Sequence, residues 1–294
     1  MGKTTRPDGH SILRCRNLDL DLSMPRIMGI LNVTPDSFFD GGLHDTVDAA
    51  LRRIENMHEQ GADIIDIGGE STRPGSDSVA VAEELRRVIP VLEAAVERFP
   101  DLLFSVDTTR YAVALEAIRA GVHIINDVSG LQKEPRFADL CAEFDTALVI
   151  MHSKGDPKTM QLNPEYDDVL AEVVAFLDRQ VTYARRTGVE SIIVDPGIGF
   201  GKTLDHNIQL LQQLQVMKRW GAPVMVAASR KSMIGQILDG RPAEGRLAGT
   251  IVLHYDALVR GAKIIRVHDI QEAKDTVLMY HALRTPQPYR NLTI

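Results

Sequence analysis

Eight short apolar runs recur along this 294-residue chain at nearly regular intervals. They begin near residues 27, 64, 102, 122, 147, 192, 224 and 264, about 34 residues apart on average, which is enough for a strand, two loops and a helix. Continuous apolar runs of this length are typical of parallel strands that helices cover on both sides. Segments with helical periodicity separate the runs. This alternation predicts an α/β fold, a single (β/α)8 TIM barrel.

The segments around the runs fit the same plan. Leu18, Leu20 and Leu22 alternate with aspartates, which predicts one strand of a short N-terminal β-hairpin that closes the barrel floor. We expect the barrel proper over about residues 26–284, in one domain spanning 1–294. Helices are expected at 49–60, 79–98, 112–120, 137–144, 167–186, 208–220, 246–260 and 273–283. Glycines that can end a helix stand at 61, 121, 188, 221 and 261.

Composition excludes several classes of partner. The net charge of −7 argues against nucleic acid, which calls for a basic face. The longest apolar stretches fall far short of the roughly 20 residues that a membrane span needs, and the N-terminus has no apolar signal-peptide core. Cys15 and Cys141 stand far apart without a partner motif, which favours reduced thiols. We therefore expect a cytoplasmic protein with no membrane partner.

Most of the runs end on a polar residue, and active sites of such barrels collect at these strand ends. Asp107, Asn126 and Asp195 end the third, fourth and sixth runs. Two carboxylates and an amide on one rim can pair with a flat heterocycle that presents amino and ring N–H donors. For each residue taken alone, capping of the following helix is an equally good interpretation.

Cations also gather on or just beyond the strand ends of this acidic chain. They are Arg73, Lys202, Arg230, Lys231, Arg266 and His268. Together they predict an anionic substrate, most plausibly a phosphate or diphosphate. A lone loop cation is usually only solvated, and that alternative stays open for Lys202 and Arg230. Asn32, which ends the first run, could hold Mg2+ together with substrate phosphates, because Mg2+ often needs few protein ligands.

Three other stretches bear on the site. The segments 31–42 and 68–78 are rich in Gly, Pro and Ser, and Phe38 lies in the first of them, where a ligand could be its apolar partner. The stretch PGIGFGKT at 196–203 imitates a nucleotide-binding P-loop. That motif needs glycine where Pro196 stands, so we reject a P-loop.

Seven segments, in this order, closely resemble bacterial dihydropteroate synthases of the pterin-binding TIM-barrel family. They are LNVTPDSFFDGG, GADIIDIGGESTRPG, SVDT, INDVSG, DPGIGFGKT, SRKSMIG and RVHD, and they span residues 31–269. The resemblance implies a folate-biosynthesis transferase that joins 6-hydroxymethyl-7,8-dihydropterin diphosphate to para-aminobenzoate and releases diphosphate, in a family that is a sulfonamide target. It further implies Mg2+ as cofactor and a homodimer.

The resemblance also assigns roles residue by residue. Pterin binding falls to Asp107, Asn126, Asp195, Lys231 and Arg266, and diphosphate binding to Asn32, Thr72, Arg73, Arg266 and His268, with Asn32 also at the metal. The para-aminobenzoate site would be bordered by Phe38, Thr72, Pro74, Phe200, Lys231 and Ser232. The catalytic set would be Asp107, Lys231, Arg266 and His268. Two alternatives share the barrel: a pterin-binding methyltransferase, and a catalytically inactive pterin-binding paralogue.

Overall fold

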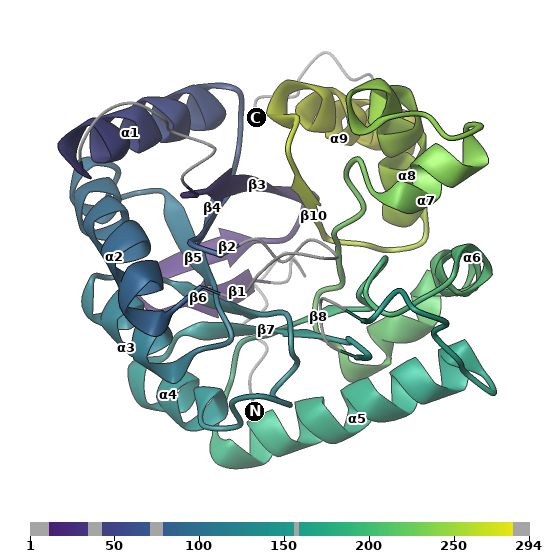
Figure 1. The fold of residues 1–294 in the computed structure, drawn as a ribbon, viewed down its shortest axis with the longest axis horizontal. Coiled ribbons are helices and arrows are strands. Elements are labelled where there is room, and N and C mark those ends of the chain that lie inside the picture. The colour runs from purple at the N-terminus through teal and green to yellow at the C-terminus, as the bar shows by residue number, and fades with distance from the viewer. Residues whose placement is uncertain (1–11, 35–42, 71–78, 156–158, 285–294) are drawn as a thin grey trace.

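A parallel sheet closes on itself to form a barrel. The computed structural model describes residues 12–34, 43–70, 79–155 and 159–284. Within these ranges eight parallel strands pair in the order β8-β7-β6-β5-β4-β3-β10-β9. A parallel bridge between Val194 and Val224 joins the two outer members. Helices form a ring around the sheet, as Figure 1 shows in the view down the barrel. The predicted (β/α)8 barrel is confirmed.

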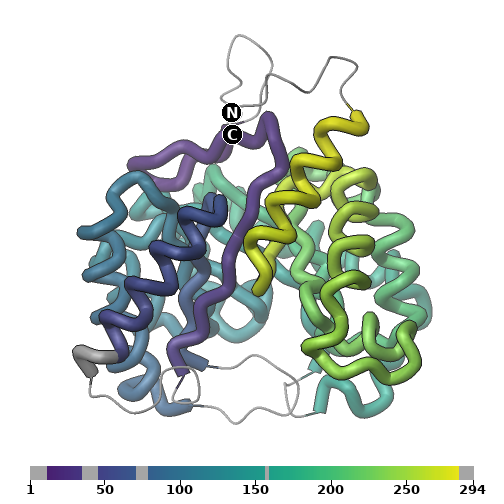
Figure 2. Tube along the Cα trace, turned by 90° about the horizontal axis from the view of Figure 1, so that it is seen from above, coloured from purple at the N-terminus to yellow at the C-terminus, as the bar shows by residue number. Residues whose placement is uncertain are grey.

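The barrel strands lie where the apolar runs predicted them. They are β3 (Arg26–Asn32), β4 (Ile64–Gly68), β5 (Leu103–Asp107), β6 (Ile124–Asp127), β7 (Ala147–Met151), β8 (Ile192–Asp195), β9 (Met225–Val226) and β10 (Ile264–Val267). An antiparallel hairpin of β1 (Ile12–Cys15) and β2 (Leu18–Asp21) precedes them. Figure 2 shows this hairpin at the end where β3 begins, so it covers the floor as predicted.

Helices follow most of the strands. They are α1 (Leu43–Glu59), α2 (Val81–Arg98), α3 (Tyr111–Arg119), α4 (Phe137–Phe144), α5 (Val169–Thr187), α6 (Leu204–Gln212), α7 (Ser232–Ile237), α8 (Leu247–Val259) and α9 (Ile270–Arg284). The segment expected as one helix at 208–220 divides into α6 and a 3-10 helix, Leu214–Trp220. The six residues of α7 were not predicted, because so short a helix shows no periodicity.

Two apolar layers hold the barrel together. One lies between the sheet and the surrounding helices, and the other fills the barrel interior. The inner layer takes one residue from each of several strands, including Met28, Ile64 and Leu103, and packs on Leu13 and Leu20 of the hairpin. The barrel interior next to the hairpin is therefore an apolar core. No helix among the described residues is long and apolar enough to cross a membrane.

The inner layer also fixes which side chains point inward above it. Successive side chains of a strand alternate between its two faces, so a residue two positions beyond an inward residue also points inward. In β5, Leu103 lies in the inner layer, and Ser105 and Asp107 follow at this spacing. The same step leads from Ile64 to Asp66, from Ile124 to Asn126, from Ile193 to Asp195 and from Ile264 to Arg266. The barrel interior thus changes from apolar to polar towards the carboxyl ends of its strands.

Candidate active site

Four inward side chains form one hydrogen-bonded group above the apolar layer. Arg266 Nε donates to Asp66 Oδ2 at 2.6 Å, and Arg266 Nη2 donates to Asp107 Oδ2 at 2.8 Å. Asn126 Nδ2 donates to the same Asp66 oxygen at 2.8 Å. The other three members of this group, Asp66, Asp107 and Asn126, are almost wholly buried. These bonds fix the guanidinium plane and the orientation of each oxygen.

One carboxyl oxygen of each site aspartate, and the amide oxygen of Asn126, has no hydrogen-bond partner among the described residues. Four buried oxygens accept no hydrogen bond from the described residues: Asp107 Oδ1, Asn126 Oδ1, Asp195 Oδ2 and Asp66 Oδ1. A buried acceptor without a donor costs roughly 1–3 kcal/mol, so proteins seldom leave several together. A flat ligand carrying several N–H donors would satisfy them. The geometry thus supports the heterocycle interpretation of these residues.

The alternative, that these residues only cap helices, does not describe their contacts. The residues at the N-cap positions of α3, α4 and α6 are Arg110, Arg136 and Thr203. Asp195 Oδ1 does accept a hydrogen bond, from Gly197 N at 2.7 Å, which orders the loop after β8. Its other oxygen remains the unpaired one.

The pKa of Asp107 lies unusually high for a carboxyl group. Burial raises this pKa from 3.8 to about 7, the charge of Arg266 opposes the rise, and the negative charges of Asp66 and Glu84 add to it. Burial also raises the pKa of Asp195. These buried carboxylates are held at an energetic cost, which is typical of functional positions.

Among the cations of the site, Lys231 has the largest electrostatic effect on the pKa of Asp195. It stands at the N-cap position of α7. Its Nζ donates to Ile198 O at 2.7 Å and lies 3.8 Å from the centre of the Phe200 ring. Burial lowers the pKa of Lys231 to about 7, Asp195 opposes this, and Arg266 adds to it. The predicted pair Phe200 and Lys231 is therefore in direct contact.

The glycines of PGIGFGKT serve this arrangement. Gly199 has φ +81°, a left-handed conformation that favours glycine, and a Cβ there would lie 2.9 Å from Lys231 Cδ.

Lys202 does not reach the barrel mouth. Its Nζ is buried within the loop, where it donates to Gly197 O at 2.8 Å and Phe200 O at 3.0 Å and contacts His152 Nδ1 at 2.9 Å. Lys202 therefore stabilises its own loop, and this loop does not present the lysine to a phosphate as a P-loop would.

Asn32 and His268 lie at two other points of the rim. Asn32 pairs in register with Gly68, and Gly68 pairs with Asp107. A Cβ on Gly68 would lie 3.4 Å from Asp107 Cβ and 3.8 Å from Asn32 Oδ1, so the two side chains flank this glycine. His268 follows β10, and its Nδ1 lies 3.1 Å from Ser229 Oγ.

Several predicted residues cannot be placed in this way. Phe38, Thr72, Arg73 and Pro74 lie outside the described residues. Ser232 begins α7 and is exposed. Arg230 forms an ion pair with Asp269 at 2.6 Å, so it is held by the protein and is not simply solvated.

Two buried acids of the site were missed by the sequence reasoning. Asp66 interrupts the run IIDIGG, and a charged residue at an inward position of an apolar strand was a signal that could have identified it. Glu84 lies on α2 and accepts from Thr108 Oγ1 at 2.7 Å, while Arg110 Nε lies 3.0 Å from its other oxygen. No pattern along the chain marks this helical glutamate as buried.

The cavities agree with this location. One opens beside Asp107 and is lined by Thr108, Ser129 and Phe200, among other residues. A larger one lies at the opposite end of the barrel, where Leu13, Leu22 and Lys263 border it. That floor cavity contains none of the predicted site residues, and we place the candidate site at the polar end.

Comparisons with known proteins agree with the sequence resemblance. The model of the pterin binding enzyme family matches residues 28–268. Dihydropteroate synthase of Escherichia coli (strain K12) is 46% identical over 272 residues, covering 92% of this chain and 95% of the relative.

Two solved structures share the fold. The Yersinia pestis dihydropteroate synthase, in a complex with a sulfonamide drug, has 44% identity, a TM-score of 0.86 and coverage of 93% of this chain and 99% of its own. The Xanthomonas albilineans dihydropteroate synthase, with 4-aminobenzoic acid, has 43% identity, a TM-score of 0.87 and coverage of 94% and 99%. The resemblance read from the motifs is confirmed, and the chain belongs to the pterin binding enzyme family, among the dihydropteroate synthases.

Proposed function

We propose that this chain is a transferase that condenses 6-hydroxymethyl-7,8-dihydropterin diphosphate with para-aminobenzoate, giving 7,8-dihydropteroate and diphosphate for folate biosynthesis. The observation that carries the proposal is the set of buried, unpaired acceptors on Asp107, Asn126 and Asp195. The amino group and ring N–H groups of a dihydropterin are the donors that such a set lacks. Family membership supports the same reaction.

The arrangement explains how the pterin would be held. Asp107 and Asn126 stand next to each other on β5 and β6, where they are paired in register. Their outer oxygens are already oriented by Arg266 and Asp66, so little side-chain freedom is lost on binding. Arg266, fixed from below by two carboxylates, would present its planar guanidinium to the pterin and the adjoining phosphate.

We place the diphosphate near Asn32, Arg266 and His268. Thr72 and Arg73, which lie outside the described residues, are the other proposed diphosphate ligands. For Mg2+ the described residues offer no cluster of three or more His, Cys, Asp or Glu ligands. Asn32 offers one hard oxygen ligand at the rim, which fits an ion that takes most of its other ligands from phosphates and water. A bound Mg2+ would neutralise charge on the departing diphosphate.

The reaction would then proceed by loss of diphosphate before attack. The bond between the pterin methylene carbon and the diphosphate oxygen breaks, and the electron pair leaves with the diphosphate. The ionised Asp107 would stabilise the positive charge that develops on the pterin, and Arg266 and His268 would stabilise the departing negative charge. The arylamine nitrogen attacks the methylene carbon and loses a proton. Phe200, Lys231 and Ser232 would border the arylamine together with Phe38, Thr72 and Pro74.

One assay tests this proposal directly. Diphosphate release from the pterin diphosphate would be followed with and without para-aminobenzoate, and the pterin product would be identified by mass spectrometry. We expect release coupled to dihydropteroate formation, with competition by a sulfonamide. Transfer of a methyl group instead would identify the methyltransferase alternative. Pterin binding without any turnover would identify the inactive paralogue.

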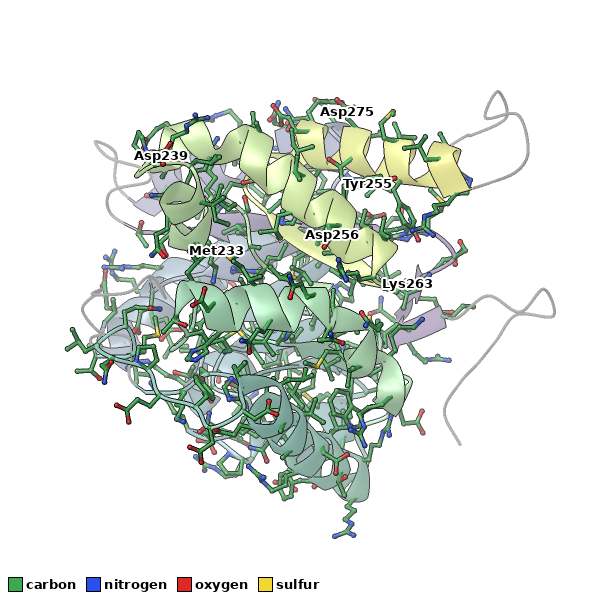
Figure 3. All side chains as sticks on the ribbon, turned by 90° about the vertical axis from the view of Figure 1, so that its right-hand side faces the viewer. Met233, Asp239, Tyr255, Asp256, Lys263 and Asp275 are labelled. Carbon is green, nitrogen blue, oxygen red and sulfur yellow. The ribbon has the colours of Figure 1, made fainter. Side chains whose placement is uncertain are left out.

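The surface supports a homodimer. Exposed apolar side chains gather on α8 and α9, where Val252 is 69% exposed, Met279 56% and Leu283 64%. Figure 3 faces α7, α8 and α9, which lie side by side on this surface. An apolar surface of this kind is typical of an interface between subunits. Sedimentation of the wild type and of Val252→Glu would test it, because the charge should favour the monomer.

We further propose that the chain forms one domain over 1–294 and works in the cytoplasm. The inner and outer apolar layers draw on strands and helices from both ends of the described chain, which supports a single folding unit. Cys15 and Cys141 are both buried free thiols, as expected in a reducing compartment.

A further inference from the structure

Arg230 has a backbone conformation that its side chain disfavours. Its φ is +57°, in the left-handed region that non-glycine residues seldom adopt. The residue lies between two groups of the proposed site, because Ser229 contacts His268 and Lys231 contacts Phe200. Backbone strain at such a place persists only where surrounding contacts hold it.

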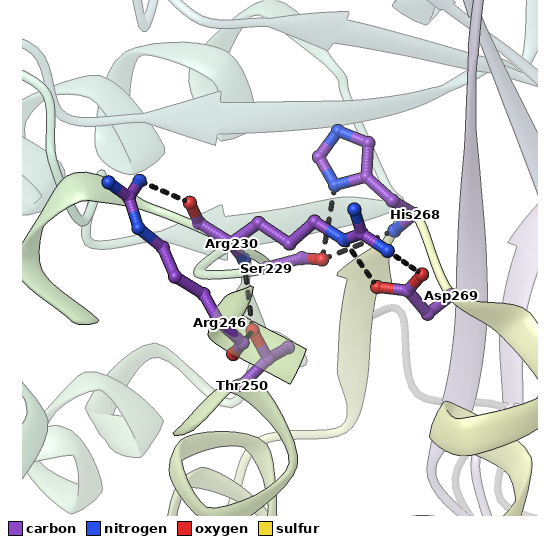
Figure 4. Close-up of polar contacts among 6 residues, drawn as sticks. All are labelled: Ser229, Arg230, Arg246, Thr250, His268 and Asp269. Carbon is purple, nitrogen blue, oxygen red and sulfur yellow. Dashed lines mark hydrogen bonds and ion pairs between the residues drawn. The ribbon is translucent and has the colours of Figure 1, made fainter. Parts of the chain in front are cut away.

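The backbone N–H, the carbonyl and the guanidinium of Arg230 each form hydrogen bonds within the protein. Its N–H donates to Thr250 Oγ1 at 3.0 Å, and its carbonyl accepts from Arg246 Nη1 at 2.9 Å. Its guanidinium donates twice to Asp269, from Nε at 2.9 Å and from Nη2 at 2.6 Å. Figure 4 shows these bonds reaching Arg230 from Thr250 on α8, from Arg246 just before α8 and from Asp269.

The ion pair joins two neighbouring strand ends. Arg230 follows β9, and Asp269 follows β10 directly after His268. A second link runs parallel to it, because Ser229 Oγ lies 3.3 Å from His268 N and 3.1 Å from His268 Nδ1. A bidentate Arg–carboxylate pair fixes both distance and orientation, which a single hydrogen bond does not. The Arg230–Asp269 pair therefore couples the position of the loop that carries Lys231 to the position of the loop that carries His268.

We propose that Arg230 and Asp269 act together as positioning residues that hold Lys231 and His268 in register across the mouth of the barrel. Neither residue needs to touch the substrate. The proposal rests on the proposed function, since it assigns the pair to the site where diphosphate leaves and the arylamine attacks. The bidentate bond and the left-handed backbone of Arg230 are the two observations that carry it.

A matched pair on the same side of the molecule provides the control. Arg260, which follows α8, places its Nε 2.6 Å from Oδ2 of Asp256 on α8, so Asp256→Asn removes an Arg–Asp bond away from the site. The test compares Asp269→Asn, Arg230→Gln, the double variant and Asp256→Asn. Each protein would be measured for kcat, for the dissociation constant of inorganic diphosphate and for that of a pterin lacking phosphates, with the melting temperature alongside.

We expect Asp269→Asn and Arg230→Gln each to lower kcat about tenfold and to weaken diphosphate binding. Binding of the phosphate-free pterin should change less than about twofold, because Asp107, Asn126 and Asp195 keep their positions. The double variant should lose no more than either single variant, since two residues acting as one unit are not additive. Asp256→Asn should match the wild type.

Two results would overturn the proposal. Losses that multiply in the double variant would mean that Arg230 acts on the substrate by itself. Unchanged kcat and diphosphate binding in Asp269→Asn would mean that the pair is only structural. Failure of the proposed function is distinguishable, because the wild type would then release no diphosphate, whereas the diphosphate-binding comparison would still test the positioning role.

Discussion

The empty site should cost the protein stability, and replacing Asp107 by asparagine should recover part of it. Burial raises the pKa of Asp107 from 3.8 to about 7. The folded protein therefore binds this proton more tightly than the unfolded chain does. Its contribution to stability is fully present below pH 3.8 and is lost as the pH rises through about 7. One pKa unit corresponds to about 1.4 kcal/mol, so the full cost above pH 7 is about 4 kcal/mol.

Asparagine keeps the shape of Asp107 but carries no charge at any of these pH values. Its oxygen can still accept from Arg266, whereas its Nδ2 would lie where an unpaired oxygen now lies, at a cost of roughly 1–3 kcal/mol. At pH 8 the net gain in unfolding free energy should be about 1–3 kcal/mol. At pH 5 the carboxylate cost in the wild type is only about 2 kcal/mol, so the two proteins should be nearly equal.

Thermal unfolding monitored by circular dichroism at pH 5 and pH 8 measures this difference. We expect Asp107→Asn to melt several degrees above the wild type at pH 8, and turnover by the variant to be lost. Asp101→Asn, at an exposed position, is the control and should not alter the melting temperature at either pH. An Asp107→Asn advantage that is absent at pH 8, or equal at the two pH values, would refute the reasoning about the buried carboxylate.

Three other predictions follow from the same site. Asp195→Ala should leave the circular dichroism spectrum unchanged but abolish binding of the pterin diphosphate as measured by calorimetry. The reason is that buried donors of the ligand would lose a partner worth roughly 1–3 kcal/mol. Wild-type affinity would show that this residue is not part of the site. Chelation of Mg2+, or His268→Ala, should slow diphosphate release far more than it weakens binding of a phosphate-free pterin, and chelator-insensitive turnover would contradict the role of the metal. Lys231→Met should stabilise the empty protein most at pH 7 and below, with a gain that shrinks as the pH rises from about 7 towards 10.5, since the native state disfavours the charged amine; a gain that grows with pH would contradict the lowered pKa.

The fold was predictable because its signals are local and repeated. Each buried strand of the barrel is a continuous apolar run, and glycines such as Gly61 and Gly188 end helices with φ of +102° and +107°. Element details failed where the signal was short or the backbone changed locally. The six-residue helix α7 shows this limit, because it is too short to show a helical period.

The site was predictable only in part, for a physical reason. Asp107 and Asp195 end their strands and Asn126 is the last residue but one of β6, so topology alone brings them to one rim. The partners that orient them come from unrelated positions. Asp66 lies inside a strand, where its charge within an apolar run is a signal in the sequence, whereas Glu84 lies on a helix and is recognised as a buried acid only in the folded chain. Conversely, Lys202 shared the strand-end signal but is enclosed by backbone carbonyls.

A crystal structure of this protein with a bound dihydropterin tests the central claim most directly. The account predicts pterin N–H groups within about 2.7–3.2 Å of Asp107 Oδ1, Asn126 Oδ1 and Asp195 Oδ2, the acceptors that lack partners. A pterin bound elsewhere, with those three oxygens still unpaired or satisfied by water alone, would contradict it.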